Sequence, residues 1–358
     1  MAHRIRLFDM GTNRGPGNLV AEFVDALDVG VSQYANAVGE AFWTVPYNHP
    51  SVNQIVPLQR HYEISRVNQR TGNYDVVGVG IMDDYKADGN EVTPSGRDYL
   101  SLLDTSITSS TTSYTNALVG NIIAAEWSAA RIQTVQANSR LGFTTTGSID
   151  ATSQTATVIS AYESRLHFMR STINILTNSN STRPIMQISR SAPYTFTFNQ
   201  NQGSLKPNVR LEYGSLISDF KYAPGYADLG TEFFGIGQKR AGATILYSDQ
   251  TYASISTYGY IQQPKLYIDV VDQASLDKMV LHDARKSARI GKGIAVQIEP
   301  GTAGGLQPWD GYDIGDALTV IINRGIVNVN GPYTCWGQEW VADKGGESLF
   351  LDLLPLDT

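Results

Sequence analysis

Cysteine and charged residues are both scarce in this sequence. Cys335 is the single cysteine among 358 residues, which excludes an intrachain disulfide, a cysteine-rich zinc module and a Cys-x-x-Cys redox motif. Only 17% of the residues are charged, with 27 Lys and Arg against 34 Asp and Glu, so the net charge is −7. This acidic balance argues against a nucleic-acid-binding surface as the main function.

Long hydrophobic runs are missing as well. Arg6 and Asp9 interrupt the apolar residues near the N-terminus before the core of a signal peptide could form. No stretch approaches the length of a membrane span. We therefore expect a soluble protein that is made inside a cell and has no contact with a membrane.

The polar surface must come mostly from uncharged residues. Ser, Thr, Asn, Gln and Tyr are frequent, and there are 33 glycines. This composition favours many short strands and turns over helix bundles. The length predicts two or three domains.

Alternating apolar and polar residues predict strands in the first hundred residues. Ile5 and Leu7 alternate with arginines in an entry strand, and Leu19, Phe23 and Leu27 recur every four residues, which fits either a short helix or a strand. We expect a short barrel or sandwich from this part. The other strands are expected at 41–45, 62–67 and 75–82, and a short helix or turn at 96–103.

Helical spacing of apolar residues follows at 118–132 and 158–176, with a polar link at 142–153. We interpret this part as a separate insert that contains helices. A further helix is expected after Asp272 or Ser275, either of which could cap it, with Gly291 as a C-terminal stop. Strands are expected again at 194–198, 209–213, 232–236, 243–247, 265–270, 317–322, 325–329 and 349–353. The predicted fold class is thus α+β, mainly β with an α-containing insert.

Metal and phosphate sites receive little support from the sequence. The five histidines are scattered, and none forms an i, i+4 pair of the kind that binds zinc. The loop at 11–17 is rich in glycine, but no lysine follows and Pro16 removes a backbone amide that a phosphate cradle needs. The acidic cluster at 83–91 could offer oxygens to calcium, yet it fails the EF-hand spacing, so we favour a solvated turn.

Catalytic signals are equally weak. No Gly-x-Ser-x-Gly motif is present, and Cys335 lies in a strand-like run where a buried structural thiol is expected. Trp336, Trp340 and the aromatic residues near 222–234 could stack on a sugar, although packing is the favoured role. Carboxylate pairs for glycoside hydrolysis could be drawn from Glu126, Glu163, Asp219, Asp228 and Glu232. We predict no catalytic, cofactor-binding or metal-binding residues.

Several segments, taken in order, resemble the baseplate hub family, the hub proteins at the tail tip of long-tailed bacteriophages. They are VGEAFWTVP at 38–46, the stretch ending in GIM at 80–82, YGSLISDF at 213–220, the helix that begins near Asp272, and GYDIGDALTV at 311–320. The resemblance lies in the order of these segments and covers most of the chain.

The resemblance implies a homotrimer in which each subunit gives two similar β-barrels to a ring, so that six barrels face a sixfold tail tube. It implies residues 1–108 as the first hub barrel, 109–192 as the helical insert, 193–272 as strands of the second barrel, and 273–358 as a helix with a C-terminal β domain. It implies no enzymatic activity, no cofactor and no metal.

The implied location is the tail tip of a virion assembled in the cytoplasm of a host bacterium. The implied partners are the tail tube or distal tail protein, tail-tip or fibre proteins and the tape-measure protein. DNA would pass through the lumen without specific binding, which an acidic wall favours because it repels phosphate. The alternatives that stay open are a cell-wall glycan hydrolase and a carbohydrate-binding tail module.

Overall fold

The structure is a computed structural model. It describes residues 3–11, 14–68, 71–108, 110–132, 141–176, 184–201, 203–222, 230–237, 247–251, 256, 259–267, 270–287, 293–298 and 311–356. The protein is mainly β with few helices, in agreement with the fold class predicted from the sequence. Within these residues no helix is long and apolar enough to cross a membrane.

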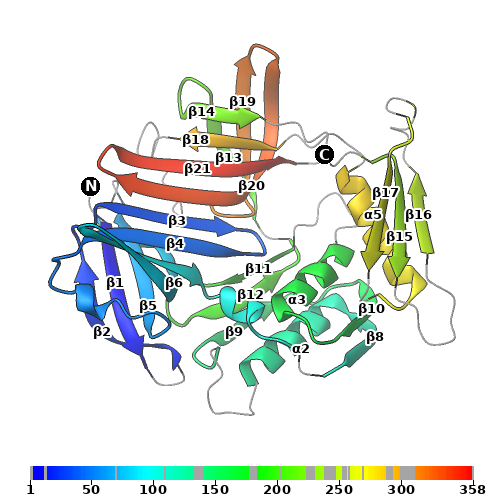
Figure 1. Cartoon of the computed structure of the whole chain (residues 1–358). Helices are drawn as coiled ribbons and strands as arrows, with labels where there is room; N and C mark the ends of the chain where they lie inside the picture. The colour runs from blue at the N-terminus through cyan, green and yellow to red at the C-terminus, as the bar shows by residue number, and fades with distance from the viewer. Residues whose placement is uncertain are drawn as a thin grey trace.

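One large sheet extends through the molecule and joins strands from both ends of the chain (Figure 1). A side branch consists of β19 (Ala317–Arg324), which pairs with β20, and β13 (Leu205–Glu212), which pairs with β19. We call all the strands of this large sheet, on the side branch and on the main path, together with the core beneath them, the sheet region. The order along the main path is β14 (Ile217–Tyr222), β18 (Ile294–Ile298), β21 (Gly346–Pro355), β20 (Val327–Asp343), β3 (Asp28–Tyr34), β4 (Ala37–Pro46), β7 (Glu91–Asp98), β6 (Tyr74–Asp88), β5 (Arg60–Val67), β1 (His3–Met10) and β2 (Pro16–Phe23).

The strands predicted from alternation are confirmed in this region. Ile5 and Leu7 of β1 are fully buried, while the arginines between them are half-buried on the other face. The open choice at Leu19 and Phe23 is decided in favour of a strand, because both lie in β2, which pairs with β1. Phe23 faces the core, whereas Leu19 remains 51% exposed.

Strand β20 changes its partner half-way along its length. Its first part pairs with β19, and its second part pairs with β3, from Gly337 opposite Tyr34 to Ala342 opposite Val29. Against β21 the register shifts between Cys335 and Gly337, which marks a β-bulge at Trp336. A bulge inserts one unpaired residue and bends the strand. This one lies where the two halves of the sheet are joined.

The remaining elements form what we call the helical region, on one side of the large sheet (Figure 1). Its helices are α1 (Ser101–Asp104), α2 (Val119–Ile132), α3 (Arg165–Ile173) and α5 (Gln273–Ser287). Its small sheets are β10 (Thr155–Ser160) with β8 (Thr112–Leu118); β11 (Ile185–Ile188), β12 (Thr195–Asn199) and β9 (Thr145–Ile149); and β16 (Tyr247–Thr251), β15 (Glu232–Gly237) and β17 (Gln262–Tyr267). Two 3-10 turns, η2 (Val52–Gln54) and η3 (Asn174–Leu176), complete the described elements.

The helix predicted at 118–132 is confirmed as α2, but the one predicted at 158–176 is wrong over its first third. Val158 lies in strand β10, and Tyr162 has a φ of 54°, which no α-helix contains. The helix begins only after Ser164, whose hydroxyl accepts a hydrogen bond from the amide of His167. Three of the apolar residues at helical spacing therefore belong to α3 itself, and the polar link at 142–153 contains strand β9.

Helix α5 is capped as one of the two sequence alternatives predicts. The carboxylate of Asp272 accepts a hydrogen bond from the amide of Ser275 at 3.1 Å, which satisfies one of the free donors of the first turn. Leu276, Val280 and Ala284 are buried along one face. The predicted stop at Gly291 lies outside the described residues, as does most of the strand predicted at 243–247.

Two separate hydrophobic cores lie beneath these elements. The core of the sheet region takes buried residues from β1 to β7 and equally from β13, β14 and β18 to β21. The core of the helical region takes them from the helices and small sheets. Strand β6 contributes to both, because Val77 packs in the first core while Val79 and Ile81 pack in the second. It thereby joins the two regions.

Candidate functional site

Three segments from distant parts of the sequence meet beside the bulge of β20. The turn between β3 and β4 approaches it, and the amide of Ala35 donates to the carbonyl of Trp336 at 2.8 Å. Ile185 of β11 and Ile314 pack with Ala35 against the Trp336 ring in a small apolar cluster. The two halves of the large sheet and the helical region are thus in contact at one place.

Asn36 fastens the helical region to this junction. Its Nδ2 donates to the carbonyl of Pro184 at 2.8 Å, and its Oδ1 accepts from the amide of Met186 at 2.7 Å. Asn36 is buried and has a φ of 57°, in the left-handed region that Asn tolerates better than most residues. A single amide side chain therefore satisfies two backbone groups of the segment that contains β11.

A polar network connects the same three segments. The guanidinium of Arg190 donates to Oε1 of Gln33 at 3.0 Å and forms an ion pair with Asp313. Nε2 of the buried Gln338 lies 3.2 Å from both Oε1 of Gln33 and Oδ1 of Asp313. These residues come from β3, β20, the loop after β11 and the turn before β19, so the network ties the junction together.

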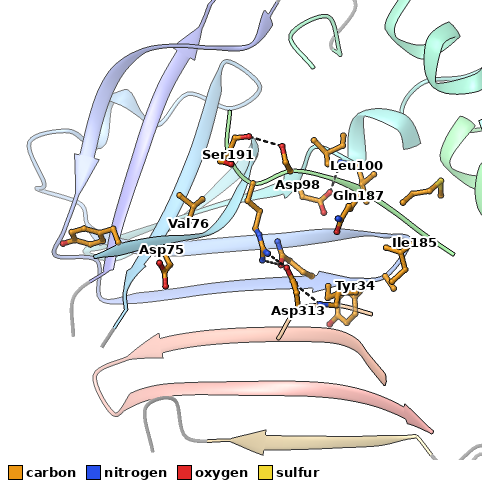
Figure 2. A pocket seen from close by; sticks show the side chains of 17 residues that line it. Tyr34, Asp75, Val76, Asp98, Leu100, Ile185, Gln187, Ser191 and Asp313 are labelled. Carbon is orange, nitrogen blue, oxygen red and sulfur yellow. Dashed lines mark hydrogen bonds and ion pairs between the residues drawn. The ribbon is translucent and has the colours of Figure 1, made fainter. Parts of the chain in front are cut away.

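A cavity of about 520 Å³ opens at this junction (Figure 2). Its walls come from residues 33–35 at the end of β3 and in the turn after it, 74–76 of β6, 98 at the end of β7, 100 just after it, 185–191, and 313–314. Figure 2 shows Asp98 and Asp313 among the side chains that line the cavity, and Asp313 forms its ion pair with Arg190. A volume of this size lies in the range of small-molecule binding sites.

Asp98 is the unusual ionisable group of the cavity. Its carboxylate oxygens accept from the backbone amides of Gly39 at 2.9 Å and Leu100 at 3.0 Å. Burial raises the pKa of Asp98 to about 7, and the hydrogen bonds from backbone amides and the charge of Arg97 oppose this only in part. The side chain is half-buried, and it borders the cavity.

The cavity offers hydrogen-bonding groups and charge. Its lining includes no His or Cys, and nucleophilic catalysis requires an activated nucleophile beside a base. Across the described parts of the chain, no group of three or more His, Cys, Asp or Glu side chains is placed to hold a metal ion. The arrangement can recognise a polar or charged group and can hold three segments together.

The carboxylates considered for glycoside hydrolysis lie on different elements. Glu126 of α2 is buried, pairs with Arg165 and accepts from the hydroxyl of Tyr114. Asp219 lies exposed on β14, and Glu232 of β15 accepts from Gln262 at the surface. Glu163 precedes α3, and Asp228 lies outside the described residues. The contacts made by Glu126 and Glu232 are those of structural residues.

The tryptophans considered for sugar stacking are used for packing. Trp340 is fully buried in the core of the sheet region, so its interpretation as a stacking surface is wrong and the favoured packing role is confirmed. Trp336 packs in the junction cluster. Cys335 beside it is fully buried, and burial raises the pKa of its thiol. The predicted burial of this thiol is thus confirmed, and desolvation disfavours the reactive thiolate form.

The acidic cluster at 83–91 forms the hairpin between β6 and β7, as the preferred interpretation predicts. Its residues from Asp84 to Glu91 are exposed, and Asp83 forms an ion pair with Arg97 at 2.7 Å. Among the histidines, His167 is exposed on α3, whereas His61 is fully buried and bonds to the hydroxyl of Tyr99. The side chain of His282 lies outside the described residues.

The junction residues Asn36, Gln33, Arg190 and Asp313 were not predicted from the sequence. Asn36 carried a partial signal, because Asn between two runs of alternating residues is typical of a tight turn. Gln33 and Arg190 carried none. Their partners lie more than a hundred residues away along the chain, and local patterns do not reveal such pairs.

No protein-family model matches the chain, and no curated protein matches it. Solved structures do. The 43 kDa tail protein of prophage MuSo2 from Shewanella oneidensis matches with a TM-score of 0.65 and 12% identity, covering 99% of both chains. A tail protein from Neisseria meningitidis matches with a TM-score of 0.63 and 11% identity, covering 99% of this chain and 97% of the other.

The prophage tail protein gp18 from Listeria monocytogenes matches with a TM-score of 0.55 and 7% identity, over 97% of this chain and 94% of that one. Identities this low establish the fold alone, since one fold serves many functions. The match nevertheless includes both halves of the large sheet and the helical region. The resemblance to tail proteins expected from the sequence is confirmed at this level: over nearly its whole length, the chain has the fold of these three tail proteins.

Proposed function

We propose that this protein is a structural component of a bacteriophage tail, namely a hub subunit that forms a trimeric ring between the tail tube and the tail tip. The single observation that supports this most strongly is the structural match over 99% of both chains to a prophage tail protein. A domain shared by chance with a larger enzyme would cover only part of each chain. Here the match extends over nearly the whole of both chains.

The arrangement of the large sheet is compatible with a ring. Strands β1 to β7, within residues 1–108, would form one ring-building barrel. Strands β13 and β14, within 193–272, and β18 to β21, within 273–358, would form the second. These two sets are joined edge to edge by β3 and β20. Three subunits would then present six such units, and the helical region, which includes the insert at 109–192, would lie outside the repeated part.

The match to tail proteins supports a non-catalytic role. The buried Glu126, one of the carboxylates considered for hydrolysis, is held by Arg165 in an ion pair. Solvent-exposed side chains of the hairpin at 84–91 are mainly acidic or polar. We propose that the protein acts through contacts with the tail tube, tip and tape-measure proteins, and that DNA passes without specific binding.

The oligomeric state tests this proposal. Light scattering after size-exclusion chromatography should give three times the 39.1 kDa subunit mass at micromolar concentration, and electron microscopy should show rings with a central channel. A monomer that persists at hundreds of micromolar would contradict the ring. In parallel, the trimer should not retain a DNA fragment at physiological salt, because an acidic surface gains no affinity from released counterions.

A further inference from the structure

The cavity at the junction contains a charge arrangement that the proposed ring does not explain. Three carboxylates, those of Asp75, Asp98 and Asp313, border it together with one guanidinium, that of Arg190. Asp313 is paired with Arg190, and Asp75 accepts a hydrogen bond from Nδ2 of Asn68 at 2.8 Å. With all three carboxyl groups ionised, the lining therefore has an excess of negative charge that faces a space large enough for a ligand.

Asp98 is the carboxylate with capacity left for a ligand. The two carboxylate oxygens offer about four acceptor positions, and the backbone amides of Gly39 and Leu100 occupy two of them, with a weaker contribution from the backbone of Ser101. Arg97 acts on Asp98 electrostatically, but its guanidinium is bonded to Asp83. A planar cation that enters the cavity would find a carboxylate that is half-buried and still able to accept hydrogen bonds.

Apolar side chains line the cavity beside the carboxylate of Asp98. Val76, Leu100, Ile185 and Ile188 supply apolar wall to the same cavity, next to the polar groups of Gln187 and the serines at 189 and 191. A ligand with an apolar stem and a planar, multiply donating head fits such a lining better than a compact, strongly hydrated ion. An alkylguanidinium has this form, and its head pairs with carboxylates through two parallel hydrogen bonds.

We propose that this cavity binds an alkylguanidinium group, with the head on Asp98 and the stem along the apolar wall. Such a group exists both as the side chain of an arginine on another polypeptide and as a free small molecule. Binding would connect strand β6, the end of β7 and the segment that follows β11, and would thereby stiffen the junction between the two regions. The proposal does not depend on a trimer, because one subunit contributes the whole lining described above.

Proton linkage gives the binding a characteristic signature. The pKa of Asp98 is raised to about 7 in the empty cavity, and a bound cation favours the ionised carboxylate. The other titratable or charged groups around it are Arg97 on the same strand, Tyr62 on β5, and five residues of the lining, namely Tyr34, Tyr74, Asp75, Arg190 and Asp313. Because about a tenth of Asp98 is ionised at pH 6 and nine tenths at pH 8, the apparent affinity should rise about tenfold between these values.

The experiment is isothermal titration calorimetry of the full chain with three probes at pH 6 and pH 8. N-acetyl-L-arginine amide represents a peptide side chain, free L-arginine represents a small molecule, and N-acetyl-L-citrulline amide is the uncharged analogue of the same shape. We expect the arginine probes to bind about tenfold more tightly at pH 8 and the citrulline probe not to bind. Tighter binding of the amide indicates a polypeptide source, and tighter binding of free arginine indicates a metabolite.

Substitutions locate the site. Asp98→Asn should weaken binding of the arginine amide at least tenfold and remove its pH dependence, whereas Asp84→Asn, an exposed acid on the β6–β7 hairpin, should change neither. The proposal is overturned if neither arginine probe binds at millimolar concentration, if citrulline binds equally, or if Asp98→Asn binds like the wild type. If Asp98→Asn does not fold, the pH series and the citrulline comparison on the wild type decide the question. If the protein is monomeric and binds the arginine probe, the proposed ring is contradicted and the proposed binding site is supported.

Discussion

The sheet region and the helical region each bury an ion pair, and the two pairs differ in how far they reach along the chain. In the sheet region, Arg66 of β5 lies 3.3 Å from Glu347 of β21 and is almost fully buried. In the helical region, Arg165 of α3 pairs with Glu126 of α2, 39 residues away. The first pair joins the two ends of the sequence, whereas the second joins two neighbouring helices.

This difference extends to the whole of each region. The sheet region consists of strands up to 17 residues long, whose hydrogen bonds connect the first hundred residues with the last fifty. The helical region consists of shorter elements that depend on caps, such as Ser164 and Asp272, and on packing. Short elements with few interstrand hydrogen bonds open locally at a lower free energy than long paired strands. We therefore expect the helical region to open more readily than the sheet region.

Removal of one buried tryptophan from each core is expected to have the largest effect on this comparison. Trp340 is buried in the sheet region, and Trp127 is buried in the helical region, where it stacks on Phe196 with ring centroids 4.2 Å apart. Trp340→Ala and Trp127→Ala should each lower the free energy of unfolding by about 3–5 kcal/mol. Chemical denaturation measures the cost, and hydrogen exchange shows where it falls. Trp127→Ala should raise exchange mainly in α2, β9 and β12. Equal exchange in both regions for both variants would show one cooperative unit.

Breaking the buried ion pair of the helical region is expected to cost a similar or slightly smaller amount. Arg165→Met leaves the carboxylate of Glu126, which is 1% exposed, without its charged partner, so we expect a loss of about 3–5 kcal/mol. Arg66→Met should cost less, because Glu347 is 11% exposed and keeps part of its hydration. The double variant Glu126→Gln with Arg165→Met should recover much of the loss in denaturant unfolding. No recovery would mean that packing of the arginine stem, and not charge, is what matters.

The contact between the two regions can be tested at Asn36. Asn36→Ala removes both hydrogen bonds to the β11 segment and places alanine at a φ of 57°, so we expect a loss of about 2–4 kcal/mol. Asn36→Gly removes the same hydrogen bonds but tolerates the backbone angle. The difference between the two variants, about 1 kcal/mol in thermal or chemical unfolding, isolates the backbone contribution. If both variants match the wild type, the junction does not depend on this side chain.

The smallest of these effects is expected at the cap of α5. Asp272→Ala removes the acceptor for the amide of Ser275 and should cost about 1 kcal/mol, confined to exchange within α5. Asp272→Asn keeps a side-chain acceptor and is the matched control, with an expected cost of a few tenths of a kcal/mol. A larger loss that spreads into the sheet region would contradict the separation of the two cores.

Much of the secondary structure could be predicted because it follows from local spacing. Ile5 and Leu7 alternate in β1, apolar residues recur at three and four positions in α2, and Asp272 precedes α5 by the usual interval. The prediction failed at Val158, where the apolar spacing fitted a helix by chance and pairing of β10 with β8 overrode it. Helical and strand periods are hard to distinguish in short apolar runs.

The candidate site was beyond such reasoning. Gln33 and Gln338 are 305 residues apart in the chain, yet their side chains lie 3.2 Å from each other at the junction. The raised pKa of Asp98 is likewise a property of its surroundings, since an Asp after a strand has an ordinary pKa until other segments remove its water. The sequence showed only that an acid was present at this position.

The amino-acid sequence by itself determined the mainly β character, helix α2, the start of α5 near Asp272, the single buried thiol and the likeness in segment order to tail proteins, because each depends on composition or on neighbours a few residues away. Only the tertiary structure decided that β20 would leave β19 for β3 at the Trp336 bulge, and that a cavity would form there. Edge pairing uses backbone groups that every residue except proline possesses, so the choice of partner is made by the packing of whole strands.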